Sequence, residues 1–121
     1  MDKPSETLKR ALEFLKAVEN NLKIGDIKTA ANREYFAAES AIVAYLQKKF
    51  KKVPKEHANI WTYSKLLGLE VDTFSLLREL YDLRLQADYG KSSEIVQLDE
   101  AAVKIYLKKV SDLIKKIKAK L

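Results

Sequence analysis

Histidine is the side-chain type that exchanges protons near neutrality, and this sequence has a single one, His57. It follows Pro-Lys-Glu, a setting in which a lone histidine more often caps a helix or packs against it. There is no cysteine, which excludes a thiolate nucleophile and a cysteine zinc site, and one histidine cannot form a histidine-rich metal cage. Glycine-rich phosphate loops, His-Glu-x-x-His and serine-nucleophile motifs are also absent from the sequence. The sequence therefore predicts no metal and no cofactor.

Arg84 and Asp88 stand where an apolar helix face would otherwise continue. They follow Phe74, Leu77 and Tyr81 at spacings of three and four residues, so all five share one face of a predicted helix. Buried charge persists only when it is paired. The two side chains are thus either a structural ion pair at the helix end or part of a functional site.

Glu39 is a second charged residue within an apolar seam, four residues after Tyr35 and three before Ile42. If its helix packs against the helix that carries Arg84, Glu39 could orient the guanidinium through a charge-assisted hydrogen bond. Part of the guanidinium would then remain free to bind a phosphate. This pairing is a hypothesis that a double-mutant cycle can test.

Five helical segments position these residues, as judged from apolar side chains recurring at 3.6-residue spacing. The expected bounds are Pro4 to Gly25, Asp26 to the basic string QKKFKKVPKEH, Pro54 to Gly68, Asp72 or Thr73 to Asp88, and Asp99 to the end, with the loop YGKSSEIVQL before the last helix. Three glycines and two prolines are too few for a sandwich or barrel. The pattern predicts one all-α domain, residues 1–121, folded as an up-and-down bundle of four to five helices.

The net charge of +6 is unevenly distributed along the chain. Residues 101–121 carry seven lysines against Asp112 alone, and the string QKKFKKVPKEH carries five lysines against Glu56. Such segments suit phosphate contacts, although lysine on a solvated helix face is ordinary. The Lys and Glu usage resembles that of thermophiles. No signal peptide or apolar span is visible in the sequence, so a cytoplasmic protein without membrane association is expected.

Three strings together resemble the HEPN superfamily, including its small stand-alone branch in archaea and bacteria. NREYFAAESAIVAYL, residues 32–46, resembles the Asn-Arg-x-Tyr-Tyr-Ala opening of that branch, with Phe36 in place of the second tyrosine. KEHANI resembles the point where the branch often has a histidine, here His57. LYDLRLQADYG, residues 80–90, resembles the signature Leu-Tyr-x-Leu-Arg-x-x-Ala-Asp-Tyr and is the most specific of the three. The resemblance covers roughly residues 6–120.

The resemblance implies a homodimer with a nucleotide- or RNA-binding cleft between protomers. Within the matching strings it assigns to that cleft the residues Arg33, Glu39, Arg84, Asp88 and Tyr89. Many members are RNA-cleaving toxins in which four to six residues separate the helical arginine from a following histidine. Here that register reaches Tyr89 and no histidine follows, so binding is favoured over catalysis. Members often pair with a nucleotidyltransferase as a toxin–antitoxin or regulatory unit, which implies such a partner.

Three alternatives to a binding module remain open at this stage. An active, metal-independent ribonuclease could use His57 in place of the missing motif histidine. A helical interaction protein could bind nucleic acid through the lysine-rich last helix. A structural bundle without a ligand would need none of these residues.

Overall fold

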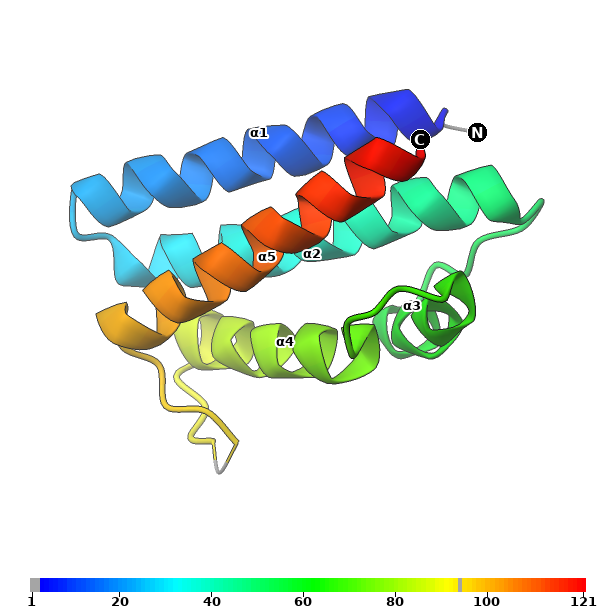
Figure 1. Cartoon of the computed structure of the whole chain (residues 1–121). Coiled ribbons are helices and arrows are strands. Elements are labelled where there is room, and N and C mark those ends of the chain that lie inside the picture. Colours follow the sequence, from blue (N-terminus) through cyan, green and yellow to red (C-terminus); the bar gives the residue numbers. More distant parts are fainter. Residues whose placement is uncertain (1–2, 94) are drawn as a thin grey trace.

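The computed structural model describes residues 3–93 and 95–121, and the described part contains helices and no strand (Figure 1). The elements are α1 (Pro4–Lys23), α2 (Ile27–Lys49), α3 (His57–Ser64), the 3₁₀ turn η1 (Lys65–Leu67), α4 (Thr73–Tyr89) and α5 (Glu100–Lys120). The four long helices alternate in direction along the chain, as Figure 1 shows. The predicted all-α bundle is therefore confirmed. Met1, Asp2 and Glu94, the last from the predicted loop, lie outside the described residues.

Aspartate caps set the start of three helices at the predicted positions. Asp26 accepts a hydrogen bond from the Thr29 amide at 3.2 Å, and Asp72 accepts one from the Ser75 amide at 3.0 Å. Asp99 does the same for the first turn of α5, at 2.7 Å from the amide of Ala102. Each carboxylate satisfies an amide that has no partner within its helix.

The predicted start of the third helix at Pro54 is wrong. The helix begins at His57, because Glu56 keeps an extended backbone (φ −82°, ψ 139°) and the Ile60 amide donates to the Glu56 carbonyl as the first helical turn forms. A proline disfavours the helical region for the residue before it, and here the segment between α2 and α3 stays non-helical past Pro54. Residues 50–56 thus form a connecting segment instead of a helical turn.

Helix α2 packs against α1, α3, α4 and α5 and forms the centre of the bundle. Its buried side chains include six alanines, whose small size lets neighbouring backbones approach closely: Ala30, Ala31, Ala37, Ala38, Ala41 and Ala44. Larger apolar side chains from the other helices fill the remaining interior, among them Val18, Leu77, Leu80, Leu83 and Leu113. Burial of this apolar surface is the main stabilising term of the fold.

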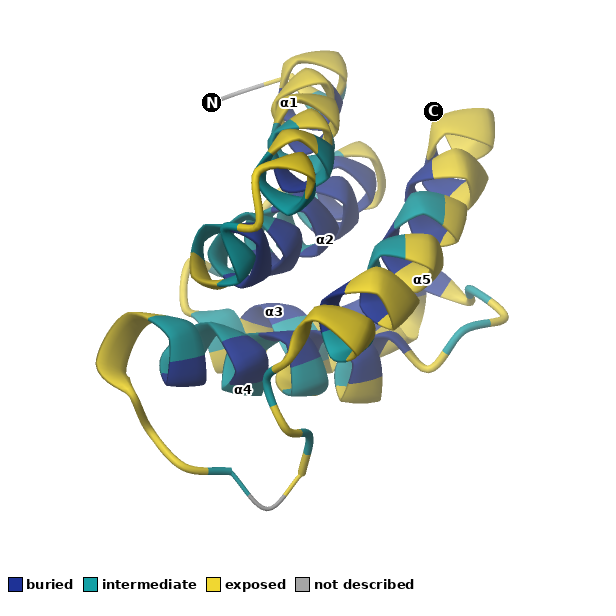
Figure 2. Ribbon diagram, turned by 90° about the vertical axis from the view of Figure 1, so that its left-hand side faces the viewer, coloured by how far each residue is buried: buried dark blue, intermediate teal, exposed yellow. Residues whose placement is uncertain are grey.

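Helix α5 presents two different faces. Figure 2 shows its inward side buried and its outward side exposed, and all seven of its lysines are exposed. Two of these lysines form ion pairs along the helix, Lys104 with Glu100 at 3.6 Å and Lys108 with Asp112 at 3.3 Å. This arrangement is that of an amphipathic surface helix. Among the described helices, none combines the length and the apolarity that crossing a bilayer requires.

Candidate functional site

Arg84 of α4 lies with its guanidinium among three aromatic rings. The guanidinium carbon is 4.8 Å from the ring centre of Phe36, 5.4 Å from that of Tyr81 and 5.9 Å from that of Tyr35. At these distances the ring faces attract the cation, and most strongly where water is excluded. The Arg84 side chain is only 16% exposed, so the charge is held at a fixed place at the edge of the core.

Asp88 fixes the orientation of the guanidinium. Its Oδ2 accepts from Arg84 Nε at 3.2 Å and from Asn32 Nδ2 at 2.9 Å, and the Asn32 carbonyl in turn accepts from Arg33 Nη1. This chain of polar contacts joins the first part of α2 to the last part of α4, which lie side by side because the two helices run in opposite directions (Figure 1). The predicted Arg84–Asp88 ion pair is present. Within the described part of the chain, Nε is the one guanidinium nitrogen of Arg84 that takes part in a hydrogen bond, so its other donors remain available.

A polar pocket of about 380 Å³ adjoins this chain of contacts. It is lined by Lys28, Thr29, Asn32, Arg33, Ala87 and Asp88. Two of these residues, Arg33 and Asp88, were expected at the site from the sequence. With two cations and one carboxylate in its wall, the pocket offers charge-assisted hydrogen bonds to an anion.

Glu39, Tyr35 and His57 form a second hydrogen-bonded group beside Arg84. Glu39 Oε2 lies 2.5 Å from His57 Nδ1 and accepts a hydrogen bond from the Tyr35 hydroxyl. Trp61 Nε1 donates to the oxygen of the same hydroxyl at 3.1 Å. Burial raises the pKa of Tyr35, and the hydrogen bond and charge of Glu39 raise it further. Tyr35 is therefore a neutral donor that holds the carboxylate in place.

The hypothesis that Glu39 orients Arg84 is not borne out by this geometry. Glu39 is bound by His57 and Tyr35, and Arg84 is bound by Asp88. The physical reason is that α3 brings His57 over Glu39, so the carboxylate finds a closer partner than the guanidinium. Tyr81 lies between the two groups, with its ring centre 5.2 Å from that of His57. His57 and Arg84 therefore belong to one cluster although they share no hydrogen bond among the described contacts.

The chemistry open to this cluster is phosphate binding and proton transfer. Arg84 can donate to phosphate oxygens. A histidine whose Nδ1 is held by a carboxylate presents Nε2 for proton exchange, and the His57 side chain is 36% exposed. The expected packing role of His57 is also present, since its ring contacts Tyr35 and Tyr81. Among residues 3–93 and 95–121, no group of three or more metal-ligating side chains is placed to hold a metal ion.

Tyr89 is the predicted site residue that the structure leaves outside the cluster. It is the last residue of α4 and is 70% exposed. Arg33, Glu39, His57, Arg84 and Asp88 are brought together by α2, α3 and α4 within two adjoining groups.

Sequence reasoning missed Glu34, which is fully buried in α2 with no accessible surface. Neither of its carboxyl oxygens has a hydrogen-bond partner in the described part of the structure. Burial raises the pKa of Glu34 to about 9, so the carboxyl is held neutral at pH 7. A signal was available, because Glu34 follows Ala30 and precedes Ala38 at four-residue spacing, on the small-residue face.

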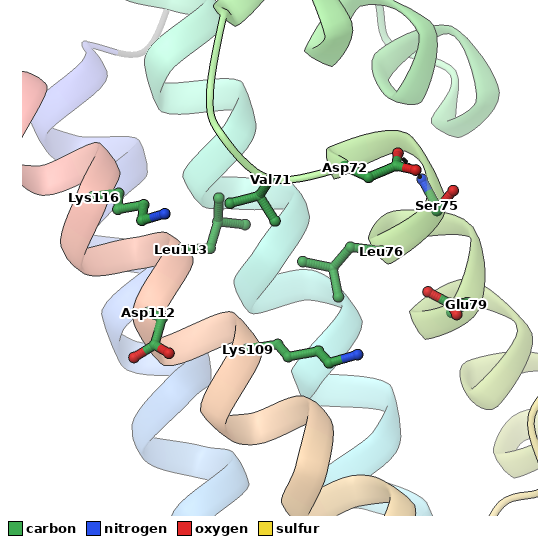
Figure 3. Close-up of a pocket in the computed structure, with 9 residues that line it drawn as sticks. All are labelled: Val71, Asp72, Ser75, Leu76, Glu79, Lys109, Asp112, Leu113 and Lys116. Carbon is green, nitrogen blue, oxygen red and sulfur yellow. Dashed lines mark hydrogen bonds between the residues drawn. The ribbon is translucent and has the colours of Figure 1, made fainter.

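Another hollow, of about 340 Å³, lies between α4 and α5 (Figure 3). Its apolar side chains are Val71, Leu76 and Leu113, and around them Figure 3 shows two lysines of α5 together with acids from both sides. The charged lining residues are Lys109, Lys116, Asp72, Glu79 and Asp112. Opposite charges nearly balance there, and none of the predicted site residues lines the hollow. We therefore place the candidate site at Arg84 and His57.

Residues 5–120 match the HEPN domain family. No curated protein matches the chain at a significant level. The family match spans the two polar groups and all four long helices.

Proposed function

Because this chain belongs to the HEPN domain family, we propose that it binds RNA or a nucleotide at the cluster centred on Arg84. We propose further that it works as a homodimer and that its partner is a nucleotidyltransferase, in a toxin–antitoxin or regulatory pair. In this proposal binding, and not catalysis, is the primary activity, since no histidine follows Arg84 in sequence.

One observation carries this proposal. The guanidinium of Arg84 is held in place, yet it has hydrogen-bond donors without a partner in the described part of the chain. Three rings and Asp88 fix its position, while the polar pocket beside Asp88 adds Lys28 and Arg33. A phosphate could bind to donors of Arg84 without breaking the Asp88 contact, because that contact uses Nε. Prepositioned donors bind at a lower entropic cost than mobile ones.

The homodimer part of the proposal follows from the family resemblance and from the exposed end of α4. Tyr89, 70% exposed and next to Asp88, would be covered by a second protomer placed over the cleft. Light scattering after size-exclusion chromatography measures the oligomeric state directly. A monomer at all accessible concentrations would contradict this part.

Arg84→Ala is the direct test of the binding proposal, with Arg78→Ala as the matched control. Arg78 is an exposed arginine of the same helix, so both variants remove one positive charge from α4. Binding of labelled single-stranded RNA and of a mononucleotide is measured by fluorescence anisotropy, and folding is checked by circular dichroism. We expect Arg84→Ala to lose about tenfold or more in affinity and Arg78→Ala to change by less than about threefold. Equal affinity of wild type and Arg84→Ala would remove the proposal.

The Glu39–His57 contact favours a second function, metal-independent RNA cleavage. A histidine oriented by a carboxylate can accept a proton from a ribose hydroxyl, while Arg84 offsets charge on the phosphate. The purified wild-type protein and His57→Ala are incubated with single-stranded RNA in the presence of a chelator. Cleavage by the wild type and its loss in His57→Ala would establish this function. Intact RNA in both reactions after several hours would exclude it.

A further inference from the structure

A basic pocket lies between the end of α2 and the connecting segment 50–56. It encloses about 520 Å³ and is lined by Arg10, Val43, Gln47, Lys51, Lys52, Val53, Pro54 and Lys55. Four of these eight residues are basic and none is acidic. This composition differs from the hollow between α4 and α5, where acids and lysines are mixed. No acidic side chain lines the pocket, and its three lysines favour the approach of an anion.

The backbone of segment 50–56, which carries three of the lining lysines, is restricted at two places. Helix α2 ends where Phe50 takes an extended conformation (φ −130°, ψ 147°), and Pro54 restricts the segment further on. Phe50 and Val53 pack against the core, while Lys51, Lys52 and Lys55 are exposed. Apolar anchors thus alternate with cations that face solvent.

Lys51, Lys52 and Lys55 form no ion pair within the described part of the chain. The described structure gives none of them a carboxylate partner, whereas Lys104 and Lys108 of α5 each have one. Release of counterions on binding a polyanion is the term that such unpaired lysines contribute. The pocket is therefore suited to several phosphates in succession.

An exposed aromatic ring stands next to the basic segment. Tyr63 of α3 is 41% exposed and contacts Phe50 edge-on, with ring centres 6.5 Å apart. An exposed ring beside a cationic groove is how single-stranded nucleic acids are bound, because unpaired bases can stack and duplex bases cannot. This favours a single strand over a duplex or an anionic membrane surface.

The basic segment leads directly into the candidate site. Lys55 lies two residues before His57 in the sequence. His57 contacts Glu39 through Nδ1, at 2.5 Å, and its ring contacts Tyr81, which lies beside Arg84. A chain of phosphates that leaves the pocket along this segment would therefore reach the cluster of His57 and Arg84.

We propose that this basic pocket binds the backbone of single-stranded RNA through Lys51, Lys52 and Lys55, with a base stacked on Tyr63. The RNA then continues past His57 to Arg84. This inference rests on the proposed function and narrows it from RNA or nucleotide to an RNA strand spanning two sites.

The test replaces Lys51, Lys52 and Lys55 together by glutamine and compares the variant with a matched control. The control replaces three exposed lysines of α5, Lys115, Lys116 and Lys118, by glutamine, so the two variants lose the same charge. The probe is a labelled single strand of about 15 nucleotides, measured over a series of salt concentrations. For the pocket variant we expect an affinity loss of about tenfold or more. The slope of log affinity against log salt concentration should also become shallower by about two. The control should change affinity by less than about threefold.

A second pair of variants tests the stacking contact. Tyr63→Ala should weaken RNA binding about fivefold or more, and Tyr63→Phe should retain it, since stacking needs the ring and not the hydroxyl. All seven substituted positions are exposed, and thermal melts check that the variants fold.

Several outcomes would overturn the pocket proposal. The proposal fails if the pocket variant keeps its RNA affinity, or if the two triple variants lose equal RNA affinity. It also fails if the wild-type protein binds no RNA, or if it binds phosphatidylcholine–phosphatidylserine vesicles more tightly than RNA. Arg84→Ala separates this proposal from the one it rests on. If Arg84→Ala abolishes binding of the mononucleotide while the pocket variant binds RNA normally, the Arg84 site stands and the pocket proposal fails. If Arg84→Ala binds the mononucleotide normally while the pocket variant loses RNA binding, the Arg84 site fails and the pocket proposal stands.

Discussion

Two acids of α2 lie five residues apart and have opposite surroundings. Glu39 accepts a hydrogen bond from Tyr35 and contacts His57 at 2.5 Å, and its side chain is 13% exposed. Glu34 is fully buried and neither of its oxygens has a partner among the described residues. A carboxylate with partners near the surface can take part in chemistry, whereas a buried acid without partners is a cost to stability.

The difference arises from the sides of the helix on which the two acids lie. Glu39 faces α3, which supplies His57 and, through Trp61, a support for Tyr35. Glu34 lies on the buried side of the helix, and its charge is a minor cause of the raised pKa of Tyr106 in α5, which burial and then Glu79 raise to about 12. The core side of α2 therefore buries Glu34 and leaves both of its carboxyl oxygens without a donor among the described residues.

The largest expected effect is on the pH dependence of folding, through Glu34. Its pKa is about 9 in the folded state against an ordinary value of 4.5, so between these values the unfolded chain has released the proton that the folded chain still holds. The contribution of Glu34 to the free energy of unfolding is therefore greatest below pH 4.5 and falls as pH rises toward 9, by about 1 kcal/mol per pH unit. Urea denaturation from pH 5 to 8.5 measures the slope.

Glu34→Gln should remove most of that slope, because the amide does not ionise. We expect the variant to be more stable than wild type at pH 8.5, and to differ little from it, or to be slightly less stable, at pH 5. Glu13→Gln, a change of an exposed acid in α1, is the control and should keep the wild-type slope. If the free energy of unfolding changes with pH in the same way for wild type and Glu34→Gln, Glu34 is not held neutral in the folded protein.

A smaller effect is expected at Glu39, where the partners can be removed one at a time. Glu39→Gln, His57→Ala and the double variant form a thermodynamic cycle, measured by urea denaturation at pH 7. The contact at 2.5 Å predicts a coupling free energy of about 1 kcal/mol, limited by the partial exposure of the histidine. Additive losses would mean that the contact does not stabilise the fold.

The smallest effect is expected between Glu39 and Arg84. The two side chains have different hydrogen-bond partners, His57 and Asp88 respectively, so the cycle of Glu39→Gln and Arg84→Lys should give a coupling below about 0.5 kcal/mol. A coupling of about 1 kcal/mol or more would restore the direct Glu39–Arg84 bond that the sequence pattern indicated.

Local chemistry in the sequence accounts for most helix starts and for the positions of the unusual charges. Asp26, Asp72 and Asp99 cap their helices as predicted, because a cap depends on a side chain and an amide only three residues away. The spacing of Arg84 and Glu39 likewise placed both on apolar helix faces, and the structure leaves both side chains largely buried. Pro54 does not begin the third helix, because the backbone stays extended as far as Glu56 and α3 starts at His57.

The sequence by itself thus determined the helical class, the three aspartate-capped helix starts and the place of Arg84 and Glu39 on apolar helix faces, since these follow from neighbours within a few residues. Only the tertiary structure decided which groups pair. Glu39 meets His57 across 18 residues, and Asn32 meets Asp88 across 56. Such partners are chosen by how the helices pack, and a one-dimensional pattern carries no distance between distant segments. The same packing left Glu34 without a hydrogen-bond partner among the described residues, whereas Glu39 has two.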